Sequence, residues 1–157
     1  MSKIPGKLKA EDYSQLIELV EDRTVLQLGC YCGRGLVALA GHARRVWVLD
    51  DFKYQDGIEG VVEELKANVN RHAPEDARID LLYGTPEGWS VPFDSEDLES
   101  DKIEVVYRDA DRRGQVEDID QRLAMGLLKR CGGIYAWHDK NHNLKWLRVD
   151  PVPVEVN

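Results

Sequence analysis

Apolar residues along this chain follow two alternating patterns, which predict a sheet with helices packed against it. Continuous apolar runs, typical of strands buried on both faces, predict strands at 25–28, 45–49, 78–83, 103–108 and 134–137. Between these runs, apolar residues recur every three or four positions and predict helices at 10–22, 36–40, 57–72 and 115–129. Alternating strands and helices predict an α/β fold with a doubly wound, mostly parallel sheet and helices on both faces.

The length of 157 residues predicts a single domain over residues 1–157. We expect a flexible start at 1–8 and a short C-terminal edge segment at 140–157. Residues 145–149 and 152–156 alternate like short strands, and Pro151 and Pro153 restrict the last one to an edge. Residues 88–101 show little periodicity and predict a loop with one short helix. The apolar residues at 144–152 predict a homodimer, because an early-ending sheet leaves the edge of its fifth strand unpaired.

Composition excludes several classes of protein. With 43% hydrophobic and 32% charged residues, the composition is typical of a globular protein. The sequence has neither a run of 18 apolar residues nor the apolar core of a signal peptide, so we expect no membrane partner. Three cysteines, an odd number, favour a reduced cytoplasmic protein over a disulfide scaffold. A net charge of −8 and few close basic pairs argue against a nucleic-acid partner.

Residues 25–51 carry the strongest chemical signal. An apolar strand breaks into a turn with three glycines, a short helix follows, and a second strand runs into Asp50 and Asp51. Glycines let backbone N–H groups approach a ligand closely, and an acid after the second strand accepts hydrogen bonds from ribose hydroxyls. The segment therefore predicts a βαβ unit that binds a ligand with a ribose and a polar group.

The glycine spacing selects among nucleotide-binding families. The turn reads G-x-x-x-G-x-G, which fits neither G-x-G-x-x-G nor the P-loop. It resembles the first motif, [ED]-x-G-x-G-x-G, of class I S-adenosylmethionine-dependent methyltransferases, and is most similar to their small-molecule, metal-dependent O-methyltransferase branch. Gln27 stands where that family has an acid, Gly29 and Gly33 match, and Tyr31 replaces the middle glycine. A neutral amide at Gln27 weakens one contact expected to the amino group of the cofactor.

Four further landmarks extend the resemblance over roughly residues 10–140. They are Glu64–Val69, Tyr83–Pro86, Val105–Asp111 and the run Leu127–Gly133 followed by Trp137–Asp139. The resemblance implies a Rossmann-like methyltransferase sheet, shortened at the C-terminus, with S-adenosylmethionine as cofactor. The residues it implies for cofactor binding are Gln27, Gly29, Cys30, Tyr31, Gly33, Asp50, Asp51, Gly84, Thr85 and Asp109.

Three further side chains follow adjacent predicted strands. Asp109, His138 and Asp139 would meet at the carboxyl edge of the sheet and are candidate ligands for Mg²⁺, as the related metal-dependent O-methyltransferases use the corresponding positions. His138 and Asp139 are also the candidate catalytic residues, with His138 the best placed to titrate near neutral pH. In the alternative, Asp109 only hydrogen-bonds the cofactor or backbone, and His138 and Asp139 cap a turn.

The leading function is methyl transfer from S-adenosylmethionine to an oxygen of a small-molecule acceptor. Arg112 and Arg113 stand where the family has a candidate base, and arginine cannot accept a proton. Arg112 would alternatively bind an anionic substrate. The alternative function is an S-adenosylmethionine-binding module without transferase activity, regulatory or structural. An NAD-dependent enzyme is disfavoured by the glycine spacing.

Overall fold

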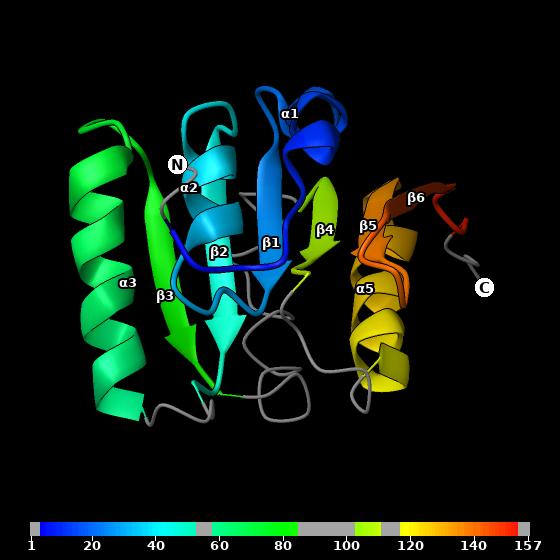
Figure 1. Cartoon of the computed structure of the whole chain (residues 1–157). Coiled ribbons are helices and arrows are strands. Elements are labelled where there is room, and N and C mark those ends of the chain that lie inside the picture. Colours follow the sequence, from blue (N-terminus) through cyan, green and yellow to red (C-terminus); the bar gives the residue numbers. More distant parts are fainter. Residues whose placement is uncertain (1–3, 53–57, 85–102, 111–116, 154–157) are drawn as a thin grey trace.

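The structure is a computed structural model that describes residues 4–52, 58–84, 103–110 and 117–153 (Figure 1). It contains one six-stranded sheet in the order β3-β2-β1-β4-β5-β6. The strands are β1 (Thr24–Leu28), β2 (Arg45–Asp50), β3 (Ile79–Tyr83), β4 (Val105–Arg108), β5 (Gly133–His138) and β6 (Leu144–Val149). The first five are parallel and β6 is antiparallel to β5. The predicted mostly parallel sheet is confirmed.

The strand order reverses between β1 and β4, which places a topological switch point at the centre of the sheet. From β1 the chain moves outward through β2 to β3, then returns to the other side of β1 as β4 and continues to β5. In open α/β sheets a ligand crevice forms at the carboxyl ends of the strands that flank such a point. The loops after β1, β2 and β4 therefore define where to look for a site.

Helices cover both faces of the sheet, because consecutive strand residues point to opposite sides. One face of the sheet, whose core includes Val25, Val48 and Val105, is covered by η1 (Ala10–Asp12), α1 (Tyr13–Val20), α2 (Arg34–Ala40) and α3 (Ile58–His72). On the other face, α5 (Glu117–Cys131) packs Ala124 and Leu128 against Leu26, Leu28 and Val106. Both faces of β1 are buried along its whole length, which is why its sequence is almost continuously apolar.

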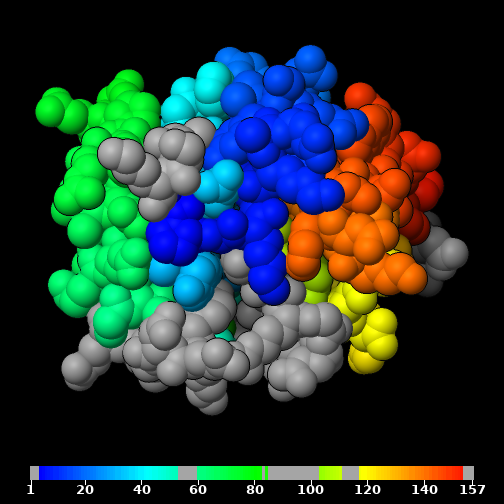
Figure 2. Space-filling view, in the orientation of Figure 1, coloured from blue at the N-terminus to red at the C-terminus, as the bar shows by residue number. Residues whose placement is uncertain are grey.

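The described part of the segment expected as a flexible start, residues 4–8, is packed against the body of the molecule. Ile4 and Leu8 are only 3% and 2% exposed. The Arg34 guanidinium, at the start of α2, donates from Nε to the Leu8 carbonyl (2.8 Å) and from Nη1 to the Ile4 carbonyl (3.1 Å). The segment crosses in front of β2 and β1 in Figure 1 and forms a dark-blue surface patch in Figure 2.

The C-terminal part corrects one expectation. The edge of the fifth strand is not left unpaired, because β6 pairs with β5 over its full length and becomes the outer strand itself. Leu144 is buried, whereas Trp146, Leu147 and Val152 are 40%, 37% and 56% exposed. The Val152 N–H donates to the Lys129 carbonyl at the end of α5 (2.8 Å), so the chain turns back onto that helix. The last predicted strand, at 152–156, lies partly outside the described residues, and those that are described, Val152 and Pro153, are not in a strand.

Within the described ranges, no helix has both the length and the apolar character needed to span a bilayer.

Candidate functional site

The turn between β1 and α2 contains residues with positive φ, a backbone conformation that glycine adopts readily. Gly29 and Gly33 have φ of 80° and 95°, and Tyr31 between them has φ of 47°. At Gly33 a Cβ would also lie 2.8 Å from Leu65 Cδ1, so the Leu65 side chain would have to shift to admit it. Tyr31, where the resembling family has glycine, holds a left-handed conformation that is uncommon for a bulky residue. Three residues of the turn, Gly29, Tyr31 and Gly33, thus have positive φ.

Asp50 holds this turn from the end of β2. Its side chain is 1% exposed, and its Oδ2 accepts a hydrogen bond from the Cys30 N–H at 2.8 Å. Its Oδ1 accepts one from the Phe52 N–H, also at 2.8 Å. Asp50 therefore fixes the loop after β1 against the loop after β2. Asp51, the neighbouring candidate for the ribose, is only partly buried.

Cys30 is a hydrogen-bond donor in this arrangement. Its Sγ lies 3.5 Å from Asp50 Oδ2 and its side chain is 1% exposed. Burial, and then the nearby Asp50 carboxylate, raise the pKa of the Cys30 thiol well above its ordinary value of 9.0. The thiol stays protonated at neutral pH and supports the carboxylate, so Cys30 is not a nucleophile.

A pair of buried polar side chains, Gln27 and Asp109, lies next to the glycine turn, near the carboxyl ends of β1 and β4. Gln27 and Asp109 are 0% and 2% exposed, and Gln27 Nε2 donates to Asp109 Oδ2 at 3.1 Å and to the Gly29 carbonyl at 3.0 Å. Gly35, in the first turn of α2, leaves the space for this carboxylate, because a Cβ there would lie 2.4 Å from Asp109 Oδ2. Two of the predicted cofactor-binding residues are thus in direct contact.

One further residue of the predicted set, Gly84, lies at the same edge of the sheet. Gly84, after β3, has φ of 144° and donates its N–H to the Asp50 carbonyl at 3.0 Å, which joins the loops after β2 and β3. Thr85 lies outside the described residues.

The described residues do not show the predicted Mg²⁺ site. Among the residues that the structure describes, which include Asp109, His138 and Asp139, no three His, Cys, Asp or Glu side chains are grouped to hold a metal ion. The His138 ring lies between two partners: Nδ1 is 3.2 Å from the His142 carbonyl and Nε2 is 2.9 Å from the Tyr107 hydroxyl. A carbonyl only accepts, so Nδ1 carries the proton, and in the neutral ring the Nε2 lone pair accepts from Tyr107. Both ring nitrogens of His138 are therefore within hydrogen-bond distance of groups of the protein itself.

Asp139 serves the turn between β5 and β6. Its Oδ1 accepts hydrogen bonds from the backbone N–H groups of Asn141 (2.9 Å) and Asn143 (3.0 Å). Those bonds, Asn143 first, lower the pKa of Asp139 below its ordinary value of 3.8. This geometry matches the alternative in which His138 and Asp139 cap a turn, so neither residue is held as a ready acid or base.

Sequence reasoning missed two side chains at this edge. Asn68, in α3, donates from Nδ2 to the Cys32 carbonyl at 2.8 Å and so supports the glycine turn. Tyr13, at the start of α1, has a buried hydroxyl without a hydrogen-bond partner among the described residues. Burial raises the pKa of Tyr13, and Arg34 lowers it and Asp109 raises it to a smaller extent. Asn68 lies within the landmark Glu64–Val69, and Tyr13 lies within the helix predicted at 10–22.

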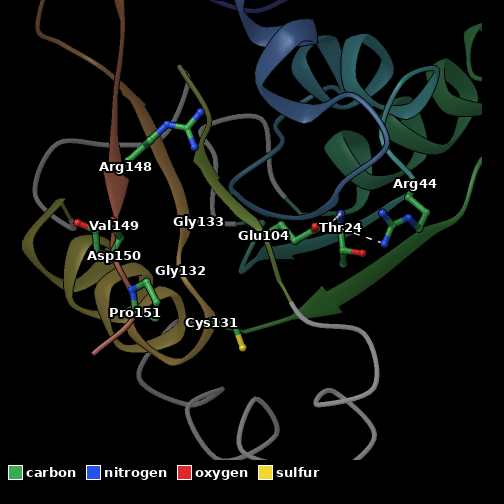
Figure 3. A pocket seen from close by; sticks show the side chains of 10 residues that line it. All are labelled: Thr24, Arg44, Glu104, Cys131, Gly132, Gly133, Arg148, Val149, Asp150 and Pro151. Atoms are coloured by element: carbon green, nitrogen blue, oxygen red, sulfur yellow. Dashed lines mark hydrogen bonds and ion pairs between the residues drawn. The ribbon is translucent and has the colours of Figure 1, made fainter. Parts of the chain in front are cut away.

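A separate hollow lies at the opposite edge of the sheet (Figure 3). It has a volume of about 590 Å³ and is lined at the amino ends of the strands by Thr24, Glu104 and Gly133, with Arg44 and Arg148 nearby. Glu104 is engaged there, because its Oε2 accepts from the Thr24 N–H at 2.9 Å and lies 3.8 Å from Arg44 Nη1. Ligands of parallel sheets bind at the carboxyl ends, so we place the candidate site around the glycine turn instead.

No protein-family model matches the sequence. No curated protein matches it either.

Several solved structures are similar in fold to this chain. An O-methyltransferase from Bacillus cereus in complex with SAH is 21% identical, with a TM-score of 0.61 over 87% of this chain and 60% of that one. A precorrin 8w decarboxylase from Methanobacterium thermoautotrophicum is 21% identical, with a TM-score of 0.58 over 87% of this chain and 66% of that one. An rRNA methylase from Streptococcus thermophilus is 12% identical, with a TM-score of 0.55 over 83% of this chain and 71% of that one.

These similarities show the fold, which is the Rossmann-like fold of class I S-adenosylmethionine-dependent methyltransferases. The O-methyltransferase branch is one of several branches among the similar structures, which include an rRNA methylase and an N-methyltransferase. The chain spans less than two thirds of the length of the Bacillus cereus O-methyltransferase and 66% of the precorrin protein.

Proposed function

We propose that this protein binds S-adenosylmethionine at the glycine turn and transfers its methyl group to an oxygen of a small-molecule acceptor. The observation that carries the proposal is the turn itself, with Gly29, Tyr31 and Gly33 all at positive φ and Asp50 fixing it from the adjacent strand. This conformation opens the backbone to a ligand at the switch point of the sheet. Three structures of similar fold are complexes with S-adenosylhomocysteine (SAH), the product that S-adenosylmethionine leaves after methyl transfer, and this supports the cofactor.

The acceptor is proposed from charge and from the resemblance of the motifs. A net charge of −8 repels polyanions at long range, which disfavours RNA even though an rRNA methylase shares the fold. The motifs are most similar to those of small-molecule O-methyltransferases. Methyl transfer is an in-line displacement at the sulfonium methyl, so the main task of the protein is to hold donor and acceptor in line.

The proposal contains no step through Mg²⁺. Among the described residues the three candidate ligands are not grouped as a metal site, and the two ring nitrogens of His138 lie 2.9 Å from the Tyr107 hydroxyl and 3.2 Å from the His142 carbonyl. The residues described here can orient the cofactor, and Asp50 is the one whose removal would disturb the turn most directly.

Isothermal titration calorimetry tests the cofactor. We expect S-adenosylmethionine and S-adenosylhomocysteine to bind and NAD to bind much more weakly. Asp50→Ala should weaken binding by about 1–3 kcal/mol, because the turn loses the acceptor of the Cys30 N–H and the ribose loses a partner. Asp76→Ala, which removes an exposed carboxylate, is the matched control and should leave affinity unchanged. Equal binding of NAD, or no effect of Asp50→Ala, would contradict the proposed cofactor.

A second candidate function is an S-adenosylmethionine-binding module without transferase activity. The engagement of both His138 ring nitrogens and of Asp139 favours it, because neither side chain is placed as a ready base. The two functions differ in turnover. Formation of S-adenosylhomocysteine with a panel of small hydroxyl acceptors would support the enzyme, and tight binding with no turnover on the whole panel would support the module.

We further propose a homodimer formed through β6. This strand is the outer edge of the sheet, and exposed edges pair readily with a second strand. Trp146, Leu147 and Val152 are the exposed large hydrophobic side chains on and beside it within the described part of the chain. Light scattering on the intact chain should give twice the monomer mass, and Trp146→Lys should give the monomer. A monomer for the intact chain at high concentration would refute this assembly.

A further inference from the structure

Strand β6 is the outer strand of the sheet (Figure 1), and a pair at the β5–β6 turn shows which way its backbone groups point. The Asp139 N–H donates to the Asn143 carbonyl at 2.9 Å. Hydrogen-bonded pairs alternate along an antiparallel ladder, so every second residue of β6, beginning with Lys145, directs its N–H and C=O groups toward β5. The N–H of Ile134, at an intervening position of β5, donates instead to the Glu104 carbonyl that precedes β4, which agrees with this alternation.

The other positions of β6 form an edge that can accept a further strand. The backbone groups of Leu144, Trp146 and Arg148 point to the outer side, where the described residues provide no neighbouring strand. None of the three is proline, and the β5–β6 register runs without a bulge. Trp146 and Leu147 are 40% and 37% exposed. Monomeric proteins usually protect such an edge with prolines, bulges or inward-pointing charges, so this regular apolar edge indicates a partner.

Side chains of β6 alternate between the two faces of the sheet. Trp146 and Arg148 share one face with Leu144, which is buried in the core on the side of α1. Lys145 and Leu147 share the opposite face. Each face of the edge therefore carries one cation beside one large exposed apolar side chain.

A second copy of β6 fits this edge if it runs antiparallel about a two-fold axis, because every outward N–H then meets a carbonyl. The two cations limit where the axis can pass. An axis at Lys145 or at Arg148 would set like charges directly opposite each other, which is destabilising. An axis at either end of the strand would pair few residues. The axis positions that pair most of β6 without like charges are Trp146 and Leu147.

The surroundings of Arg148 decide between these two positions. With the axis at Leu147, that side chain faces its own copy, and Trp146 lies opposite the partner's Arg148 on both sides of the axis. A guanidinium over an indole ring is a favourable cation–π contact. With the axis at Trp146, Arg148 would lie opposite Leu144, which is 7% exposed and offers no ring.

We propose that two copies of this protein form one continuous sheet, in which β6 pairs antiparallel with the β6 of the partner about a two-fold axis at Leu147. This inference rests on the proposed homodimer and adds its register and geometry. The axis reverses the strand directions, so the carboxyl ends of the parallel strands lie at opposite edges of the joined sheet in the two copies. Strands β4 and β5 also separate β1 from β6, so each glycine turn lies away from the partner.

Disulfide trapping with glutathione disulfide as oxidant tests the register. All variants carry Cys131→Ser, so that the exposed native thiol does not react. Leu147→Cys should give a covalent dimer on a non-reducing gel, because this non-hydrogen-bonded pair has a Cα separation of about 4.5 Å, within the range of a disulfide. Lys145→Cys and Trp146→Cys are matched controls on the same strand. In this register each would lie about 14 Å and about 8 Å from its own copy, beyond the roughly 7 Å limit, and should not be trapped.

A charge swap tests the same register without a covalent bond. Trp146→Lys should give a monomer in light scattering, because the new charge faces the partner's Arg148 twice. Adding Arg148→Glu sets opposite charges across the two strands and should restore the dimer. With the axis at Trp146, the two lysines introduced by Trp146→Lys would still face each other and the double variant would stay monomeric. The monomeric Trp146→Lys should keep its affinity for S-adenosylhomocysteine to within about threefold, since the glycine turn lies away from the partner.

The outcomes separate the register from the assembly. A parent protein that is monomeric at high concentration refutes the homodimer, and this inference falls with it. A dimer trapped at Trp146 or Lys145 instead of Leu147, or a double variant that stays monomeric, overturns the register while the homodimer stands. A dimer that none of the three cysteines traps and that Trp146→Lys does not dissociate overturns pairing through β6. A larger loss of affinity in the monomer would place the partner at the glycine turn and overturn the proposed geometry.

Discussion

Replacing Gly35 with alanine adds a single methyl group at the most crowded point of the candidate site. The new Cβ would lie 2.4 Å from Asp109 Oδ2, and it would be 3.5 Å from Tyr107 Cε2 and 3.6 Å from Gln27 Nε2. The carboxylate cannot stay where it is. Either Asp109 rotates and loses its bond to Gln27, or the start of α2 moves away from β4.

The magnitude follows from these two routes. Losing a hydrogen bond to a charged group costs about 1.5–3 kcal/mol, and overpacking a core costs about 1–3 kcal/mol. Alanine is favoured over glycine inside a helix by about 1 kcal/mol, which offsets part of either cost. We therefore expect Gly35→Ala to lower the free energy of unfolding by about 1–2 kcal/mol. Affinity for S-adenosylhomocysteine should fall as well, because Asp109 is displaced.

Gly126→Ala is the matched control. Gly126 also lies in a helix, α5, but a Cβ there would meet nothing within 4 Å. The same change should therefore raise stability by about 0.5–1 kcal/mol through the lower backbone entropy of the unfolded chain. Urea denaturation of both variants, with the m-value unchanged, measures the difference. If Gly35→Ala were as stable as Gly126→Ala, the close packing of α2 on Asp109 would be wrong.

Three further predictions concern groups elsewhere in the fold. Arg108→Met should cost about 3–5 kcal/mol of stability in denaturant melts, because it removes the guanidinium that lies 2.9 Å from the carboxylate of Asp120, which is 0% exposed. Arg108→Met with Asp120→Leu should recover most of that loss, and an equally unstable double variant would contradict it. A thiol reagent should label one cysteine quickly, the exposed Cys131, while Cys30 and Cys32 react only on unfolding; rapid labelling that survives Cys131→Ser would disprove this. The lowered pKa of Asp139 means that its contribution to stability is present above its unfolded pKa and is lost as pH falls through the folded one. Asp139→Asn should therefore flatten the loss of stability on acidification below about pH 4, and melts with the parent slope would refute it.

The sequence alone was enough for the framework of the fold. Strands buried on both faces, such as β1, need apolar residues at nearly every position, and this leaves a pattern that few other structures share. Helix α3 shows its apolar stripe through Val61, Val62 and Leu65, which all lie in the core. The glycine turn was readable because Gly29 and Gly33 occupy conformations that other residues rarely adopt.

The tertiary structure decided what the side chains at the carboxyl edge do. Asp109, His138 and Asp139 follow adjacent strands, so the sequence placed them at one edge and suggested a shared metal. Their actual partners, Gln27, Tyr107 and the turn after β5, are set by side-chain direction and loop path, which no local pattern encodes. Asp109 and Gln27 are 82 residues apart in sequence and share a hydrogen bond only because β1 and β4 are neighbours at the switch point of the sheet. Arg34 ties the N-terminal segment to the start of α2, because its guanidinium donates to the Ile4 and Leu8 carbonyls. The order of the strands and the hydrogen bonds of Arg34 form only in the complete fold. The sequence could therefore predict where the site lies, but not which side chains interact there.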